Sequence, residues 1–288
     1  MSNIKKKIII GTANFSKKYG LFNKKFNCND FKKLIKFLDN HKILYFDTAL
    51  LYNSEKFLER LQFNKKKIKL ITKVPLLGQK RTKIFNLLKK QLKIIKLQKF
   101  EAILLHETIN LKKKEILKNV NFLKDLKKAK LTKKIGLSLY NKYDYNKFRK
   151  YFKPDIIQIP LNIFDQEFLD EKILFDLKKN KIEVHARSIF LQGLLLNDKN
   201  SFDGKLKKYN SEINNYCFRN KISRLDFCIN FIVRQKLLDK IVIGIDSLEQ
   251  LKEIINFKKK KDFEIFKKLN ISKNITKPYK WEKKIKIK

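Results

Sequence analysis

The sequence predicts an α/β protein of one domain, a closed (β/α)₈ or TIM barrel in which eight parallel strands alternate with helices. Eight short apolar runs alternate along the chain with stretches of helical periodicity. Several runs are apolar at successive positions, as at residues 8–10 and 102–105, which is typical of parallel strands covered on both faces. The alternation takes up about 250 of the 288 residues, a usual length for this barrel.

The eight expected strands are short and rich in Ile, Leu and Val. They span residues 7–11, 43–47, 68–74, 102–106, 135–139, 156–160, 182–187 and 241–245. An open, doubly wound sheet is the alternative architecture. Such a sheet ordinarily carries a Gly-x-Gly-x-x-Gly loop after its first strand, and that motif is absent from the sequence.

The expected helices carry apolar residues three and four positions apart. The first has its apolar stripe at Phe31, Leu34, Ile35 and Leu38, with Asn29 or Asp30 as its cap. Further helices are expected near 54–61, 84–95, 116–126, 142–151, 166–177, 222–238 and 248–257. Two stretches lack clear periodicity, so we expect a long polar loop at 189–219 and a basic tail at 258–288, both in the single domain 1–288 whose barrel spans about 7–257.

The formal net charge of +42 suggests a nucleic-acid partner, but the kinds of basic residue that make up this charge argue against one. The chain has 63 Lys and only 7 Arg, whereas proteins that bind phosphates or guanines usually depend on Arg. Abundant Lys, Ile, Asn and Phe are typical of an AT-rich genome. We therefore expect no specific nucleic-acid partner; the alternative, a charge-driven complex, would weaken steeply as salt rises.

The cysteines and the hydropathy bear on the compartment. Cys28, Cys217 and Cys228 are odd in number and lack metal-ligand spacing, which favours a reducing compartment, and we expect a cytoplasmic protein. No apolar run approaches the roughly 20 residues of a membrane-spanning helix, and the basic start lacks the apolar core of a signal peptide. We expect no membrane partner, no metal, and a monomer or weak homo-oligomer.

Polar residues stand at the carboxyl ends of the expected strands, where a barrel places its chemistry. They include Asp47, Lys73, His106, Ser138, Gln158, Arg187, Ser188 and Asp246. Each alone has an ordinary structural explanation, such as a turn or a helix cap. Lys73 is more informative because it follows an apolar run and needs a partner when buried, and Asp47 on the adjacent strand can supply one.

Several segments resemble one known family. They are Asp47-Thr48-Ala49 with Tyr52, then Lys73, then His106, followed by Gly136-Leu137-Ser138, Gln158, His185-Ala186-Arg187-Ser188, Leu191-Gln192-Gly193, Gly244 and Gln250. In this order they resemble the aldo-keto reductases, bacterial members in particular, over essentially residues 7–257. That resemblance implies the (β/α)₈ barrel and an oxidoreductase that moves a hydride between a nicotinamide cofactor and an aldehyde, ketone or sugar.

The resemblance assigns a catalytic tetrad to Asp47, Tyr52, Lys73 and His106. Tyr52 would be the general acid in reduction and the base in oxidation. Its hydroxyl has an ordinary pKa near 10, and the ammonium of Lys73, held by Asp47, would lower that value. His106 would donate a hydrogen bond to the carbonyl oxygen and orient the substrate.

The resemblance also assigns a cofactor site. Its residues are Gly11, Thr12, Ser138, Gln158, Arg187, Ser188, Phe190, Gln192, Gly193, Gly244, Asp246, Gln250 and Glu253. Two residues depart from the family pattern: Arg187 falls where many members stack a Tyr on the nicotinamide, and Leu139 falls where Asn is common. Asp246 lies where a basic or small polar residue often meets the 2′-phosphate of NADP. NADP(H) is the expected cofactor, with NAD(H) as the alternative.

The sequence thus predicts an NAD(P)H-dependent aldo-keto reductase acting on a small-molecule carbonyl or sugar. The alternative is a cofactor-binding regulatory or partner subunit on the same fold with little turnover, because fold does not fix function.

Overall fold

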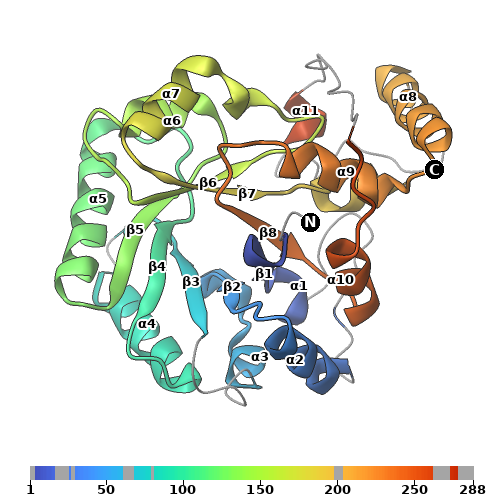
Figure 1. Cartoon of the computed structure of the whole chain (residues 1–288). Coiled ribbons are helices and arrows are strands. Elements are labelled where there is room, and N and C mark those ends of the chain that lie inside the picture. Colours follow the sequence, from blue (N-terminus) through green and yellow to red (C-terminus); the bar gives the residue numbers. More distant parts are fainter. Residues whose placement is uncertain are drawn as a thin grey trace.

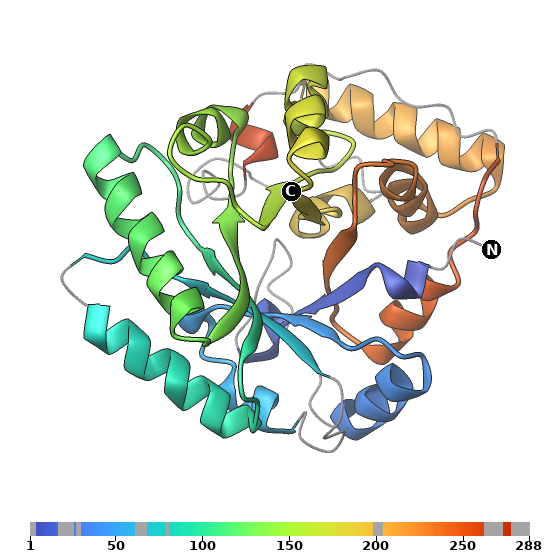
Figure 2. The ribbon, with the colours of Figure 1, turned by 60° about the vertical axis from the view of Figure 1, so that its left-hand side comes forward.

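The computed structural model describes residues 4–16, 26, 30–60, 68–78, 81–197, 204–261 and 273–277. Its eight strands form a closed barrel in chain order, with every neighbouring pair parallel (Figures 1 and 2). The strands are β1 (Ile8–Gly11), β2 (Tyr45–Asp47), β3 (Lys69–Val74), β4 (Phe100–Leu105), β5 (Thr132–Ser138), β6 (Ile156–Pro160), β7 (Glu183–Arg187) and β8 (Lys240–Gly244). The predicted barrel is confirmed, and each strand overlaps its expected run.

Helices surround the strands, as both views show (Figures 1 and 2). They are α1 (Ala13–Ser16), α2 (Phe31–Asn40), α3 (Glu55–Arg60), α4 (Arg81–Ile95), α5 (Lys113–Lys128), α6 (Lys142–Phe148), α7 (Glu171–Lys179), α8 (Gly204–Asn220), α9 (Arg224–Val233), α10 (Leu248–Ile255) and α11 (Lys273–Thr276). The apolar stripe predicted for α2 is buried. Asp30 stands at its N-cap position without a side-chain cap bond, and Asn29 lies outside the described residues.

The expectation of a long polar loop at 189–219 is wrong. A 3-10 helix (Leu191–Leu196) and the 17-residue helix α8 occupy most of it. Helix α8 buries Leu206, Ile213, Tyr216 and Cys217, together with the polar Asn210. The intervening residues are mostly polar, so this stripe is sparse and does not stand out in the sequence.

The barrel interior is layered, because every second residue of a strand points inward. Its middle layer is largely apolar and includes Ile9, Ile71, Leu104 and Ile156. Gly136 lies at the same level of β5, where a Cβ atom would come within 2.1 Å of the carbonyl oxygen of Ile156. The strands therefore approach closely here, and the layer forms a floor for the residues above it.

Two residues farther along each strand, the inward positions become polar or lose their side chain. This upper layer consists of Gly11, Asp47, Lys73, His106, Ser138, Gln158, Arg187 and Gly244. All eight line one cavity at the carboxyl ends of the strands. The alternation of the strands and the closure of the barrel together bring residues more than 200 positions apart into one site.

Candidate active site

Asp47 and Lys73 form an ion pair at the bottom of this cavity. The Nζ atom of Lys73 donates to Oδ1 of Asp47 and, over 3.2 Å, to the carbonyl oxygen of Thr48. The side chain of Lys73 is 2% exposed and that of Asp47 is 4% exposed. Complete burial lowers the pKa of Lys73, and the charge of Asp47 opposes that shift. The partner predicted for Lys73 from sequence is therefore the partner that it has.

The turn after β2 positions Tyr52. Residues Leu50–Tyr52 form a 3-10 turn that ends at Asn53, whose φ of 52° is left-handed. The hydroxyl groups of Thr48 and Ser54 are 2.8 Å apart and fasten the two sides of the turn. Tyr52 is thereby directed into the cavity, where the Nζ atom of Lys73 lies 5.4 Å from the centroid of its ring.

His106 follows β4 and faces Tyr52. The two rings meet edge to face with their centroids 5.7 Å apart. Burial, with the positive charges of Lys73 and then Arg187, lowers the pKa of His106 to about 3. The imidazole is thus neutral at physiological pH, and one of its nitrogens carries a proton that it can donate. Its buried Nδ1 atom has no partner among the described residues.

Gln158 on β6 extends the network toward β7. Its Nε2 atom donates to Oδ2 of Asp47 over 2.8 Å, so each oxygen of that carboxylate accepts a bond. The Oε1 atom of Gln158 is buried in the cavity wall and has no partner among the described residues. A buried carbonyl oxygen without a donor is costly, so the site offers a ligand one acceptor with fixed geometry.

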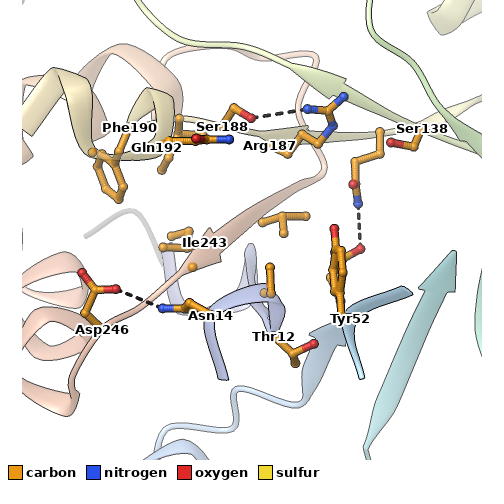
Figure 3. A pocket seen from close by; sticks show the side chains of 18 of the residues that line it. Thr12, Asn14, Tyr52, Ser138, Arg187, Ser188, Phe190, Gln192, Ile243 and Asp246 are labelled. Carbon is orange, nitrogen blue, oxygen red and sulfur yellow. Dashed lines mark hydrogen bonds between the residues drawn. The ribbon is translucent and has the colours of Figure 1, made fainter. Parts of the chain in front are cut away.

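The segment after β7 forms another wall with a strained backbone. Ser188, Leu191 and Gln192 have φ angles of 58°, 46° and 55°, and Gly193 has 94°. Non-glycine residues rarely adopt positive φ, and such strain is concentrated at functional sites. In Figure 3, Ser188, Phe190 and Gln192 lie across the cavity from Thr12 and Asn14. This segment and the residues just after β1 therefore enclose the middle of the cavity.

Asp246 marks the end of the cavity away from Tyr52 (Figure 3). Its Oδ1 atom accepts from Nδ2 of Asn14 over 3.0 Å, and its backbone N–H donates to Gln250 over 2.8 Å. The side chain of Ser247 caps α10 just behind them. The cavity has a volume of about 600 Å³ and connects this end with the Asp47–Lys73 pair.

Sixteen of the seventeen residues predicted from sequence line this one cavity. The exception, Glu253, is exposed on α10 outside it. Residues that sequence reasoning missed also contribute to the lining: Ala13, Asn14, Tyr140, Ile189, Leu196, Asn197, Val242 and Ile243. Tyr140 directly follows a predicted strand, and Ala13, Asn14 and Ile189 stand two or three positions beyond one, which is a signal that could have found them. Within the described ranges, no cluster of His, Cys, Asp or Glu is arranged to hold a metal ion.

Comparison with known proteins matches the chain to one family. The family model described as the aldo/keto reductase family covers residues 7–271. The chain belongs to the aldo/keto reductase family. It is accordingly an oxidoreductase of a family that generally binds nicotinamide cofactors and acts on small-molecule carbonyl substrates.

Solved structures show the same fold at low identity. An aldo-keto reductase from Bacillus halodurans in its holo form is 16% identical, with a TM-score of 0.68 over 87% of this chain and 85% of that chain. A glycerol dehydrogenase from Gluconobacter oxydans is 18% identical, with the same TM-score and coverage. A search of the curated proteins finds no match to the sequence. None of the helices that the structure describes has the length and hydropathy needed to cross a membrane.

Proposed function

We propose that this reductase uses NADP(H) or NAD(H) to interconvert a small aldehyde, ketone or sugar with its alcohol, with Tyr52 as the proton donor and acceptor. The observation that carries the proposal is the grouping of Tyr52, Lys73, Asp47 and His106 at one end of a cavity. Its volume of about 600 Å³ suits a cofactor and part of a substrate.

The residues around the tetrad fit a nicotinamide cofactor. The unpartnered Oε1 atom of Gln158 is an acceptor for the carboxamide N–H of such a ring, and Ser138 lies beside it in the strand register. At Gly244 the inward position is open, since the nearest heavy atom to a Cβ there would be 3.9 Å away. The segment 188–193 would hold the diphosphate. When bound, the cofactor supplies or accepts the hydride.

The protein's own part is the movement of one proton. Tyr52 would give its hydroxyl proton to the carbonyl oxygen during reduction and take it back during oxidation. The ammonium of Lys73, 5.4 Å from the ring, favours the phenolate that this transfer leaves behind. Asp47 holds Lys73 in place. Neutral His106 would donate a hydrogen bond to the same oxygen, which fixes the substrate between the two rings.

Between the two cofactors, NADP(H) is the first proposal, following the resemblance. One observation favours NAD(H) as the second. The charged residues that line the cavity among the described ranges are Asp47, Lys73, Arg187 and Asp246, so the described wall at the Asp246 end carries a carboxylate and no cation. A 2′-phosphate would meet that negative charge, whereas a 2′-hydroxyl could donate to it.

The proposal is tested by mixing the protein with NADPH or NADH and a panel of aldehydes, ketones and sugars. We expect a loss of the 340-nm absorbance of the reduced cofactor that depends on both protein and carbonyl. A matched preparation of Lys73→Met is the control for contaminating reductases. Tight cofactor binding without turnover of any carbonyl would contradict the proposal and favour a regulatory or partner subunit.

A further inference from the structure

The guanidinium group of Arg187 is a cation in the cavity wall, and no carboxylate among the described residues neutralises it. Its Nη2 atom donates to the carbonyl oxygen of Leu139 over 2.9 Å, and Nη1 is 3.4 Å from the hydroxyl of Ser188. The group lies over the ring of Tyr140, 4.6 Å from its centroid. Within the part of the chain that the structure describes, no Asp or Glu pairs with it, and its buried Nε atom has no partner.

The second cation of the cavity differs in this respect. Lys73 and Asp47 cancel each other as an ion pair, so among the described lining residues Arg187 leaves the tetrad end of the cavity with one net positive charge. Figure 3 shows Arg187 over the half of the cavity that contains Tyr52 and Ser138, with Asp246 toward the other end. Its charge acts on the reacting centre, because it helps to lower the pKa values of both His106 and Lys73.

This charge matters to a cofactor whose own charge changes during the reaction, and the inference rests on the proposed function. A nicotinamide ring is a cation when oxidised and neutral when reduced. To react with a carbonyl held by Tyr52 and His106, the ring must lie at the tetrad end, within the field of Arg187. The diphosphate and adenosine are the same in both forms, so their contacts cancel when the two forms are compared.

We propose that Arg187 makes this cavity bind the reduced nicotinamide cofactor more tightly than the oxidised one, so that the oxidised form competes less for the site when both are present. In the reduction, a hydride with its two electrons passes from the cofactor to the carbonyl carbon, and the proton of Tyr52 passes to the oxygen. The cofactor thus gains a positive charge as it is oxidised, and Arg187 repels it. The oxidised product is therefore released more readily than the reduced cofactor.

The expected size of the effect follows from the charges. Two unit charges about 7–10 Å apart, at an effective dielectric constant of about 20, repel each other enough to change a dissociation constant by about 10- to 50-fold. Arg187 is held in position by Leu139, Ser188 and Tyr140, so turning away from the ring would break these contacts. A guanidinium that bound the diphosphate instead would strengthen the binding of both forms equally.

The test is to measure Kd for the reduced and the oxidised form of the same cofactor, by fluorescence and calorimetry, on the full chain. We expect wild type to bind the reduced form at least about tenfold more tightly. Arg187→Gln should lower that ratio about tenfold, whereas Arg187→Lys should largely keep it. Arg81→Gln is the matched control, because Arg81 is exposed and pairs with Asp125 far from the cavity.

Equal affinity of wild type for both forms would overturn the role of Arg187, even if Arg187→Gln did not fold. So would a ratio left unchanged in Arg187→Gln, which is the result expected if the residue only supports the wall or binds the diphosphate. Binding of neither form by wild type would instead refute the proposed function itself.

Discussion

Replacing Lys73 with Met should separate the contribution of the buried ion pair to stability from its contribution to catalysis. Met keeps most of the side-chain volume but removes the ammonium, and it leaves the carboxylate of Asp47 with one bond, from Gln158 over 2.8 Å. Breaking a buried pair by removing one partner costs about 3–5 kcal/mol. Because that one bond remains, we expect a loss in the free energy of unfolding of about 3 kcal/mol.

A second substitution tests the origin of this loss. Adding Asp47→Asn to Lys73→Met removes the uncompensated charge, and we expect it to restore about 2 kcal/mol of the free energy of unfolding. Carbonyl reduction should stay about 10²- to 10⁴-fold below wild type in both variants, because neither has an ammonium beside Tyr52. Urea unfolding and steady-state kinetics give the two quantities on the same preparations.

Lys277 provides the matched control. It is 4% exposed in its side chain, against 2% for Lys73, and pairs with the buried Asp165 over 2.9 Å and with Glu167 over 3.2 Å. Its Nζ atom also donates to the carbonyl oxygen of Tyr140 over 2.7 Å. Lys277→Met should therefore lose a similar free energy of unfolding while keeping kcat within about threefold of wild type. Retained activity in Lys73→Met, or activity regained together with stability in the double variant, would refute a catalytic role for the ammonium of Lys73.

Three further predictions concern other parts of the site and barrel. Because burial and two neighbouring cations lower the pKa of His106 to about 3, the unfolded chain binds this proton first on acidification. Protonation of this group in the unfolded chain should thus lower the free energy of unfolding by about 2 kcal/mol between pH 8 and pH 5. Urea unfolding of His106→Gln should show a free energy that depends less steeply on pH than in wild type, and an identical dependence in the two proteins would contradict this. Asp246→Ser should tighten NADPH binding about tenfold and change NADH binding less than threefold, measured by fluorescence; an unchanged NADPH affinity would argue against a 2′-phosphate near this carboxylate. Gly136→Ala should lower the free energy of unfolding by at least about 3 kcal/mol or prevent folding, since its Cβ atom would lie 2.1 Å from a backbone oxygen. Gly244→Ala should lower it by less than about 1 kcal/mol. Equal unfolding midpoints of the two variants in urea would show that the barrel relaxes at Gly136.

The barrel and much of its cavity lining could be predicted because both depend on short-range patterns. A parallel strand buried on both faces is apolar at successive positions, and the polar residue that ends such a run is easily seen. Closure of the barrel then brings Asp47, Lys73, His106 and Gln158 together without further information from the sequence. The partner of Lys73 followed from the cost of burying an unpaired charge.

Other features depend on geometry that residue types do not determine. Helix α8 was missed because its apolar stripe is sparse among polar residues. The positive φ angles of Ser188, Leu191 and Gln192 could not be predicted from the sequence. Glycine is the residue that usually marks such a conformation, and none of these three positions is a glycine. That no described carboxylate pairs with Arg187 also becomes visible only in three dimensions, because Glu183, four residues before it in the sequence, pairs with Lys134 instead.

Tyr52→Phe tests the central claim most directly, because it removes one hydroxyl group and no charge. The measurement is the rate of oxidation of bound NADPH or NADH by an aldehyde in a single turnover, with cofactor binding measured on the same sample. If Tyr52 supplies the proton, the variant should bind cofactor as wild type does and react about 10²- to 10⁴-fold more slowly. Equal single-turnover rates in the two proteins would contradict the account.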